Sequence, residues 1–158
     1  MRKTIIHQAD DEPIPAIDLN FLDLEHLAQI EFTSECPEYP VESALLLTAD
    51  TGWQAASSGE QIIRVVFDQP RTIEHIVLVF EEFQQSRTQE FVLYWLIDKE
   101  NSYREILRQQ YHFSPPNTTQ EIEHYEVRLE QLKALELKII PDMGGGNACA
   151  KLKKLRLA

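Results

Sequence analysis

The sequence predicts an all-β fold, a sandwich of two packed antiparallel sheets with an N-terminal extension. Three observations favour this fold. Apolar and polar side chains alternate from residue 28 onward in segments of seven to nine residues, which is the pattern of β-strands. Turn-forming residues separate these segments at regular intervals. The chain has 158 residues, of which 43% are hydrophobic, so it is long enough for one core and short for two.

The extension is expected to span residues 1–27 and to pack on a sandwich that spans residues 28–158. Residues 10–15 join three acidic side chains to two prolines, whose rings fix the backbone and remove two hydrogen-bond donors. We therefore expect an extended conformation there. Residues 18–27 carry five apolar side chains with neither a two-residue nor a helical period. We interpret them as a lid with room for one short helical turn.

The first clear strand is expected at residues 61–68, where Ile63, Val65 and Phe67 share one face. Gln69 and Pro70 end this strand. The same reasoning gives the other strands, at residues 72–80, 89–97, 104–112, 122–129, 134–140 and 151–157. The glycine run at residues 144–146 indicates a rim loop that needs positive φ, because the Gly-Lys-Ser/Thr pattern of a phosphate loop does not follow it.

The charge balance argues against nucleic acid as a partner. Lysine and arginine number 15 against 26 aspartates and glutamates, a formal net charge of -11, and this charge repels phosphate groups. One dense basic run lies near the C-terminus, and its cations alternate with leucines. We interpret this run as the solvated face of a strand. It consists of Lys151, Lys153, Lys154 and Arg156.

A cytoplasmic location without membrane insertion is expected. Charged residues interrupt every hydrophobic segment, so none has the length that spans a bilayer. The N-terminus lacks the apolar run of a secretory signal. The two cysteines, Cys36 and Cys149, lie far apart in the sequence, and in this compartment we expect them to stay reduced.

The residue pattern predicts no enzymatic activity, no cofactor and no metal site. The five histidines fall in separate segments without the spacing of zinc ligands. No serine lies in a Gly-x-Ser-x-Gly setting, and neither cysteine has a recognisable base nearby. Glu81 and Glu82 are neighbours in sequence, which does not give an opposed acid and base.

Several groups of residues resemble a known family. Thr33-Ser34-Glu35 opens a loop, Thr51-Gly52-Trp53 ends the following turn, and residues 61–80 form a strand, a turn and a strand. Residues 135–157, with the glycine loop inside them, resemble a closing pair of strands. Over about four-fifths of the chain, these features resemble the discoidin domain, or coagulation factor type C domain, of the galactose-binding-like superfamily. The resemblance implies a jelly-roll β-sandwich that binds a ligand without catalysing a reaction.

The chain departs from this family at its structural calcium site. Many members hold calcium with an Asp-Gly pair, backbone carbonyls and a Glu in the last strand, and the matching positions here are Leu46, Leu47 and Lys154. A hard cation needs several oxygen ligands with negative charge. We therefore expect no calcium, and we take as a hypothesis that the Lys154 ammonium partly occupies the vacated position.

In discoidin-like domains, loops at one end of the sandwich bind the ligand. The matching loops here are residues 34–42, 81–88 and 141–149. Sugar sites combine aromatic rings with planar polar groups, so the resemblance implies carbohydrate binding by side chains of these loops. The candidates are Glu38, Tyr39, Phe83, Gln85, Arg87 and Asn147. Each also has a structural interpretation. For Arg87 it is an ion pair with Glu82 or Glu90.

Three alternatives stay open. A polar groove for a sugar or a peptide forms if one set of side chains shares a sheet face. That set is Arg87, Gln89, Arg108, Gln110 and His112. An intracellular protein-protein interaction domain on the same fold is the main alternative to sugar binding, because no partner domain accompanies this sequence. A subunit of a larger assembly, docked through the acidic N-terminal arm, is the third.

Overall fold

The computed structural model describes Arg2 and residues 19–158. The predicted extended conformation of residues 10–15 therefore lies outside the described residues, as does most of the extension. Residues 19–27 contact the sandwich: the backbone N–H of Leu22 donates to the carbonyl of Leu157 at 2.8 Å. They contain the four-residue helix α1 (Leu24–Leu27), and Leu24 is 3% exposed in the core.

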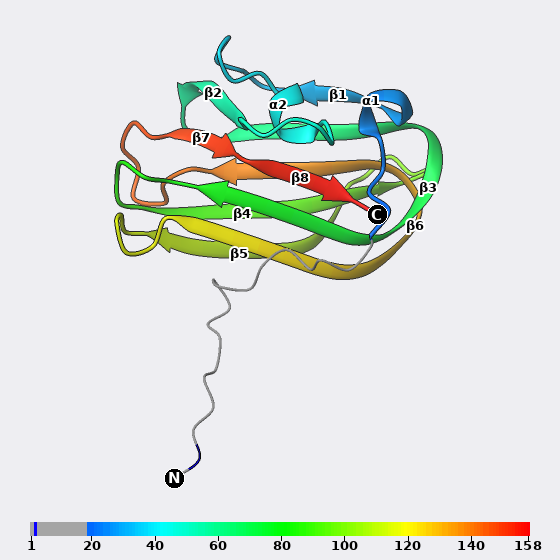
Figure 1. Ribbon diagram of the computed structural model, residues 1–158. Coiled ribbons are helices and arrows are strands. Elements are labelled where there is room, and N and C mark those ends of the chain that lie inside the picture. The colour runs from blue at the N-terminus through cyan, green and yellow to red at the C-terminus, as the bar shows by residue number, and fades with distance from the viewer. Residues whose placement is uncertain (1, 3–18) are drawn as a thin grey trace.

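Two long strands hold the fold together. β3 (Gln61–Glu81) and β6 (Gln120–Ile140) pair antiparallel along most of their lengths. The first half of β3 and the second half of β6 lie in one layer with β1 (Ala28–Phe32), β4 (Arg87–Ile97) and β5 (Arg104–Phe113), in the order β1-β3-β6-β4-β5 (Figure 1). Their other halves lie in the second layer.

Shorter elements complete the second layer. β8 (Lys154–Leu157) pairs with the second half of β3, and β7 (Cys149–Leu152) pairs with β2 (Trp53–Ser58) in a two-stranded sheet. The helix α2 (Glu42–Leu45) lies between β1 and β2 in the chain and contacts β8. In Figure 1 these segments lie over the larger sheet.

The predicted strands are found, with corrected boundaries. Residues 61–68 and 72–80 belong to one strand, β3. Its pairing with β6 is interrupted around Pro70, but the strand continues and the pairing resumes after it. A proline has no N–H for the ladder, so it lies where the strand bends from one layer into the other. Residues 122–129 and 134–140 merge into β6 in the same way. Residues 151–157 divide at Lys153 between β7 and β8.

Side chains from both layers form one core. The strands contribute alternate residues, such as Phe67 and Phe80 of β3 and Phe91 of β4, all with no exposed surface. Trp53 is 1% exposed, and its Nε1 donates to the Ser34 carbonyl at 2.9 Å. Burial of apolar surface on this scale is the main stabilising contribution in a domain of this size. The predicted all-β jelly-roll sandwich is confirmed.

Two further features follow from the model. Among the described residues, no helix is long and apolar enough to cross a membrane. Cys36 and Cys149 are free thiols. They lie on opposite edges of β2, because Cys36 bonds the backbone of Gln54 on one edge and Cys149 pairs with Ser58 on the other.

Candidate functional site

Four connections gather at one end of the sandwich. They are the β2-β3 turn and the loops of residues 82–86, 114–119 and 141–148, at the left of Figure 1. Backbone hydrogen bonds join them: Gly59 donates to Ala148, Glu82 to Thr119, and Met143 to Thr88. In discoidin-like domains, the loops at one end of the sandwich bind the ligand. A pocket lined by the exposed ring of Phe83 lies beside these four connections.

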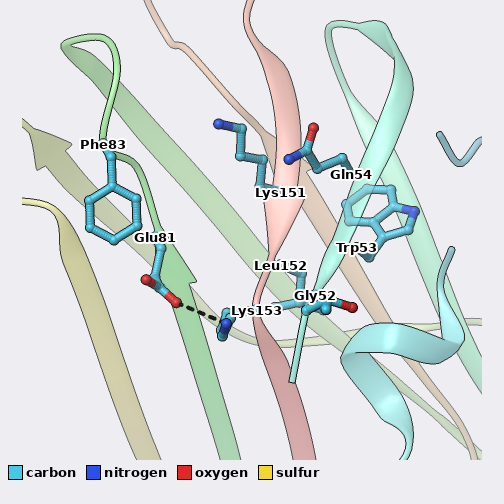
Figure 2. A pocket seen from close by; sticks show the side chains of 9 residues that line it. Gly52, Trp53, Gln54, Glu81, Phe83, Lys151, Leu152 and Lys153 are labelled. Atoms are coloured by element: carbon cyan, nitrogen blue, oxygen red, sulfur yellow. Dashed lines mark ion pairs between the residues drawn. The ribbon is translucent and has the colours of Figure 1, made fainter. Parts of the chain in front are cut away.

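This pocket lies between the start of β2, the end of β3 and the junction of β7 and β8. Its volume is about 160 Å³. Nine residues line it: Thr51, Gly52, Trp53, Gln54, Glu81, Phe83, Lys151, Leu152 and Lys153. Figure 2 shows the Phe83 ring on one side and the polar ends of Lys151 and Gln54 on the other. Phe83 is 63% exposed, so its ring is accessible to a ligand. We call this the Phe83 pocket.

The pocket floor depends on a close approach of two chain segments. Gly52 has φ +81°, and a Cβ at this position would lie 3.0 Å from the Leu152 carbonyl oxygen. Glycine adopts this backbone at little cost, and a Cβ at this position would displace the Leu152 backbone. The approach brings Trp53 opposite Leu152, and Gln54 opposite Lys151, in the β2-β7 register. The amide of Gln54 and the ammonium of Lys151 are therefore neighbours.

Ion pairs balance the charges on the lower side of the pocket. The Lys153 ammonium lies 3.6 Å from Glu81 Oε1 and 3.9 Å from Asp50 Oδ1, and it donates to the Asp50 carbonyl. Lys154 lies 3.4 Å from the same Asp50 oxygen. Two cations thus face two anions, and their charges cancel at close range.

A buried polar network supports the pocket from behind. Arg87 Nε donates to Glu82 Oε1 at 2.8 Å, and both side chains have no exposed surface. Arg87 Nη1 donates to Gln89 at 3.1 Å and to the Pro141 carbonyl at 2.8 Å. The guanidinium also lies 4.8 Å from the ring centre of Phe113. The network ties the loop that carries Phe83 to β4 and to the loop before β7.

The buried polar network extends from Arg87 to β6 on one side and to the pocket on the other. Gln89 Nε2 donates to Glu121 Oε1 at 3.2 Å on β6. On the pocket side, Glu82 Oε2 accepts from the backbone N–H of Gln84 at 3.0 Å and lies 3.4 Å from the Lys151 ammonium. One carboxylate therefore orders the start of the Phe83 loop and the strand that carries Lys151.

The ionisation of Glu82 makes stability depend on pH. Burial raises its pKa, but the hydrogen bonds from Arg87 and Gln84 and the charges of Lys151 and Arg87 outweigh burial, so the pKa lies below its ordinary 4.5. A carboxyl with a lowered pKa stabilises the fold fully above the pKa it has when unfolded. This contribution is lost as the pH falls through the folded-state pKa.

We predict that Glu82→Gln destabilises the domain at pH 7 and that this deficit narrows below about pH 4.5. Urea denaturation of both proteins at pH 7, 5, 4 and 3 measures it. Glu60→Gln, at an exposed position of the β2-β3 turn, is the control and is expected to show no such trend. A deficit that stays constant down to pH 3 would contradict the assigned ionisation.

The structure brings only some of the predicted site residues to the pocket. Phe83 lines it. Gln85 and Asn147 are exposed on the two loops at the same end, Glu38 is exposed, and Tyr39 is half-buried. These four do not line the Phe83 pocket. The carbonyl of Tyr39 accepts a hydrogen bond from Gln54 at 3.1 Å, so its segment supports the pocket strand. Ligand binding by the four residues stays a prediction.

Arg87, one of the candidate ligand-binding residues, is buried rather than exposed at the rim. Its side chain has no exposed surface, and the ion pair with Glu82, which is one of its structural interpretations, holds it in the core. A side chain without exposed surface makes no contact with a ligand. The alternation along β4 could have predicted this burial, because alternate residues of a strand face the same side. Arg87 and Gln89 therefore share a face with the core residues Phe91 and Leu93.

The alternative of a polar groove required five side chains on one sheet face, and this condition is not met. Arg87 and Gln89 point into the core, whereas Arg108, Gln110 and His112 lie exposed on β5. The register pairs these three with Val92, Glu90 and Thr88, which belong to the other face of β4. The five side chains therefore divide between two faces of the sheet.

The cation that binds the turn at Leu46 is Arg156, not Lys154. Arg156 Nη1 donates to the Ala44 carbonyl at 2.8 Å, and Nη2 donates to the Leu46 carbonyl at 2.9 Å. Lys154 instead pairs with Asp50. Arg156 is 7% exposed, and burial lowers its pKa, which Asp50 opposes. The interpretation of Arg156 as part of a solvated strand face is corrected accordingly.

The sequence reasoning missed the role of Gln54 and Lys151. Lys151 was grouped with a solvated strand face, although it lies in the pocket lining. The signal was the matched motif Thr51-Gly52-Trp53, because a glycine with positive φ marks a site where another chain segment comes close. The partner segment, residues 149–152, could not be identified without the register.

Several solved structures with a similar fold are carbohydrate-binding modules. The family 32 module of Clostridium perfringens NanJ, in complex with galactose, has a TM-score of 0.63 at 13% identity, over 87% of this chain and 96% of that one. These structures share the jelly-roll β-sandwich fold of this chain. A pectin-binding module has a TM-score of 0.58 at 18% identity, over 83% of this chain and 89% of that one.

A third example is the CBM32-5 module of Clostridium perfringens CpGH89, in complex with GalNAc-β-1,3-galactose. Its TM-score is 0.62 at 14% identity, over 87% of this chain and 98% of the module. No protein-family model matches the sequence, and no curated protein matches it. At these identities the comparisons establish the fold, and the ligand must be argued from the pocket.

Proposed function

We propose that this domain is a non-catalytic carbohydrate-binding module and that the Phe83 pocket binds the sugar. The exposed ring of Phe83 beside a small polar pocket carries the proposal. A sugar ring has an apolar face and a rim of hydroxyl groups. An accessible aromatic ring covers the apolar face of the sugar, and polar side chains form hydrogen bonds with its hydroxyl groups.

The lining provides these hydrogen-bonding groups. Gln54 offers an amide with two donors and an acceptor, Thr51 a hydroxyl, and Lys151 an ammonium. The volume of about 160 Å³ suits a single sugar residue at the end of a glycan. Solved modules of the same fold are in complex with galactose and with a GalNAc-containing disaccharide, which supports a sugar as the ligand.

Binding without catalysis is the simpler function for these side chains. The carboxylates at the pocket, Glu81 and Glu82, are held in ion pairs with Lys153 and Arg87. Outside the pocket, His75 Nδ1 lies 3.0 Å from His124 Nε2, so the fold joins two histidines that are distant in sequence. Neither lines the Phe83 pocket.

We predict that Phe83→Ala weakens sugar binding about tenfold or more, because stacking is lost while the core is untouched. A glycan array identifies the ligand, and calorimetric titration measures its Kd. Phe32→Ala is the matched control, since Phe32 is 40% exposed on β1 and does not line this pocket. It is expected to bind like the unmodified protein.

Two outcomes would contradict the proposal. If no glycan on the array binds, the alternative function is favoured, which is a protein-protein interaction domain on the same fold. Equal loss of binding in Phe83→Ala and Phe32→Ala would place the sugar elsewhere. Thermal unfolding of each variant shows whether the domain stays folded.

A further inference from the structure

The Phe83 pocket carries one cation whose carboxylate partner is shared with a closer cation, although the chain has a net charge of -11. This cation is Lys151. Its ammonium lies 3.4 Å from Glu82 Oε2, which is its one hydrogen-bonding partner among the described residues. The distance is long for a charge-assisted hydrogen bond.

Glu82 is already balanced by another cation. Arg87 binds its other oxygen at 2.8 Å, and Glu82 Oε2 also accepts the backbone N–H of Gln84 at 3.0 Å. A carboxylate carries one negative charge, so Lys151 is the second cation at one anion. Glu121, the next carboxylate of the buried network, accepts a hydrogen bond from Gln89.

The other charges at the pocket cancel. Lys153 and Lys154 face Asp50 and Glu81, as described above, which gives two cations for two anions. The Lys151 ammonium therefore decides the sign of the local charge. It lies beside the Gln54 amide and across the pocket from the Phe83 ring (Figure 2).

We propose that the ligand is an acidic sugar whose carboxylate binds Lys151 and the Gln54 amide while its ring stacks on Phe83. This inference rests on the proposed function and specifies its ligand class. A carboxylate accepts hydrogen bonds from both groups at once. The side chain of Lys151 is 25% exposed, so its attraction is only partly screened by solvent.

The test uses sugars that differ only in one group. Calorimetric titration compares methyl galactopyranoside with methyl galacturonopyranoside, and methyl glucopyranoside with methyl glucuronopyranoside. A sialic acid glycoside forms a separate arm, which distinguishes a sialic acid from a uronic acid as the source of the carboxylate. In at least one arm the acid is expected to bind about tenfold tighter than its neutral counterpart at low salt. The difference shrinks at high salt.

Variants assign the effect to one side chain. Lys151→Gln is expected to weaken binding of the acid far more than binding of the neutral sugar, so that the preference for the acid is lost, whereas Lys151→Arg retains the preference. Lys99→Gln, an exposed lysine in the β4-β5 turn, is the matched control and leaves the preference unchanged. Thermal unfolding shows that each variant is folded.

The outcomes separate the two proposals. A protein that binds neutral sugars as tightly as acidic ones, or that keeps its preference in Lys151→Gln, overturns this inference and leaves carbohydrate binding intact. A protein that binds no sugar in any arm or on the array overturns both.

Discussion

Replacing Arg87 with methionine is expected to lower the free energy of unfolding by about 3–5 kcal/mol, the usual cost of removing one partner of a buried ion pair. The variant leaves the Glu82 carboxylate without its closest cation, at a position with no exposed surface. It also removes the hydrogen bonds to Gln89 and to the Pro141 carbonyl. Urea denaturation measures the change.

The control for this prediction is an exposed ion pair of the same chemistry. Arg104 Nη2 lies 3.1 Å from Glu100 Oε1, and the two side chains are largely exposed. Arg104→Met is expected to change stability by at most about 1 kcal/mol. If Arg87→Met and Arg104→Met destabilise the domain equally, the buried network does not support the pocket in the way described.

Arg156→Met is expected to destabilise the domain by about 2–4 kcal/mol. The guanidinium donates to the carbonyls of Ala44, Leu46 and Leu155, and a methionine leaves these buried acceptors without a charged donor. Thermal unfolding measures the loss. Arg128→Met is the control, because Arg128 is mostly exposed and its ion pairs lie at the surface.

The same contacts predict the response to calcium. The resemblance assigns a calcium ligand to the position of Leu46, whose carbonyl is bound by Arg156. Apolar side chains at Leu46 and Leu47 add no negative charge there. Neither millimolar calcium nor a chelator is therefore expected to change the Tm. A Tm that rises with calcium would contradict this assignment.

The sequence was sufficient for the fold because the two-residue period and the turn residues act locally. The strands at residues 89–97 and 104–112, for example, could be predicted from this pattern alone. β2 was missed, because Ala55, Ala56 and the serines after them give no clear alternation. Its position depends on Gly52 and Leu152, which are 100 residues apart, and on pairing with β7.

The candidate site shows the same division. Phe83 was predicted because an aromatic side chain in a polar loop is informative without knowledge of its neighbours. Arg87 was misplaced because a charged residue is normally exposed, and here Glu82 compensates its burial. Gln54 and Lys151 become a pair only through the register of β2 and β7. Local patterns thus predict elements and single side chains, whereas long-range pairing decides which of them meet.

Chemical-shift mapping with an acidic sugar tests the central claim most directly. Backbone amide resonances are followed during titration with the uronic or sialic acid glycoside that binds most tightly. We predict that the largest shifts fall at the residues that line the Phe83 pocket, which are 51–54, Glu81, Phe83 and 151–153. Shifts that centre on Glu38, Tyr39 and Asn147, or no shifts at all, would contradict it.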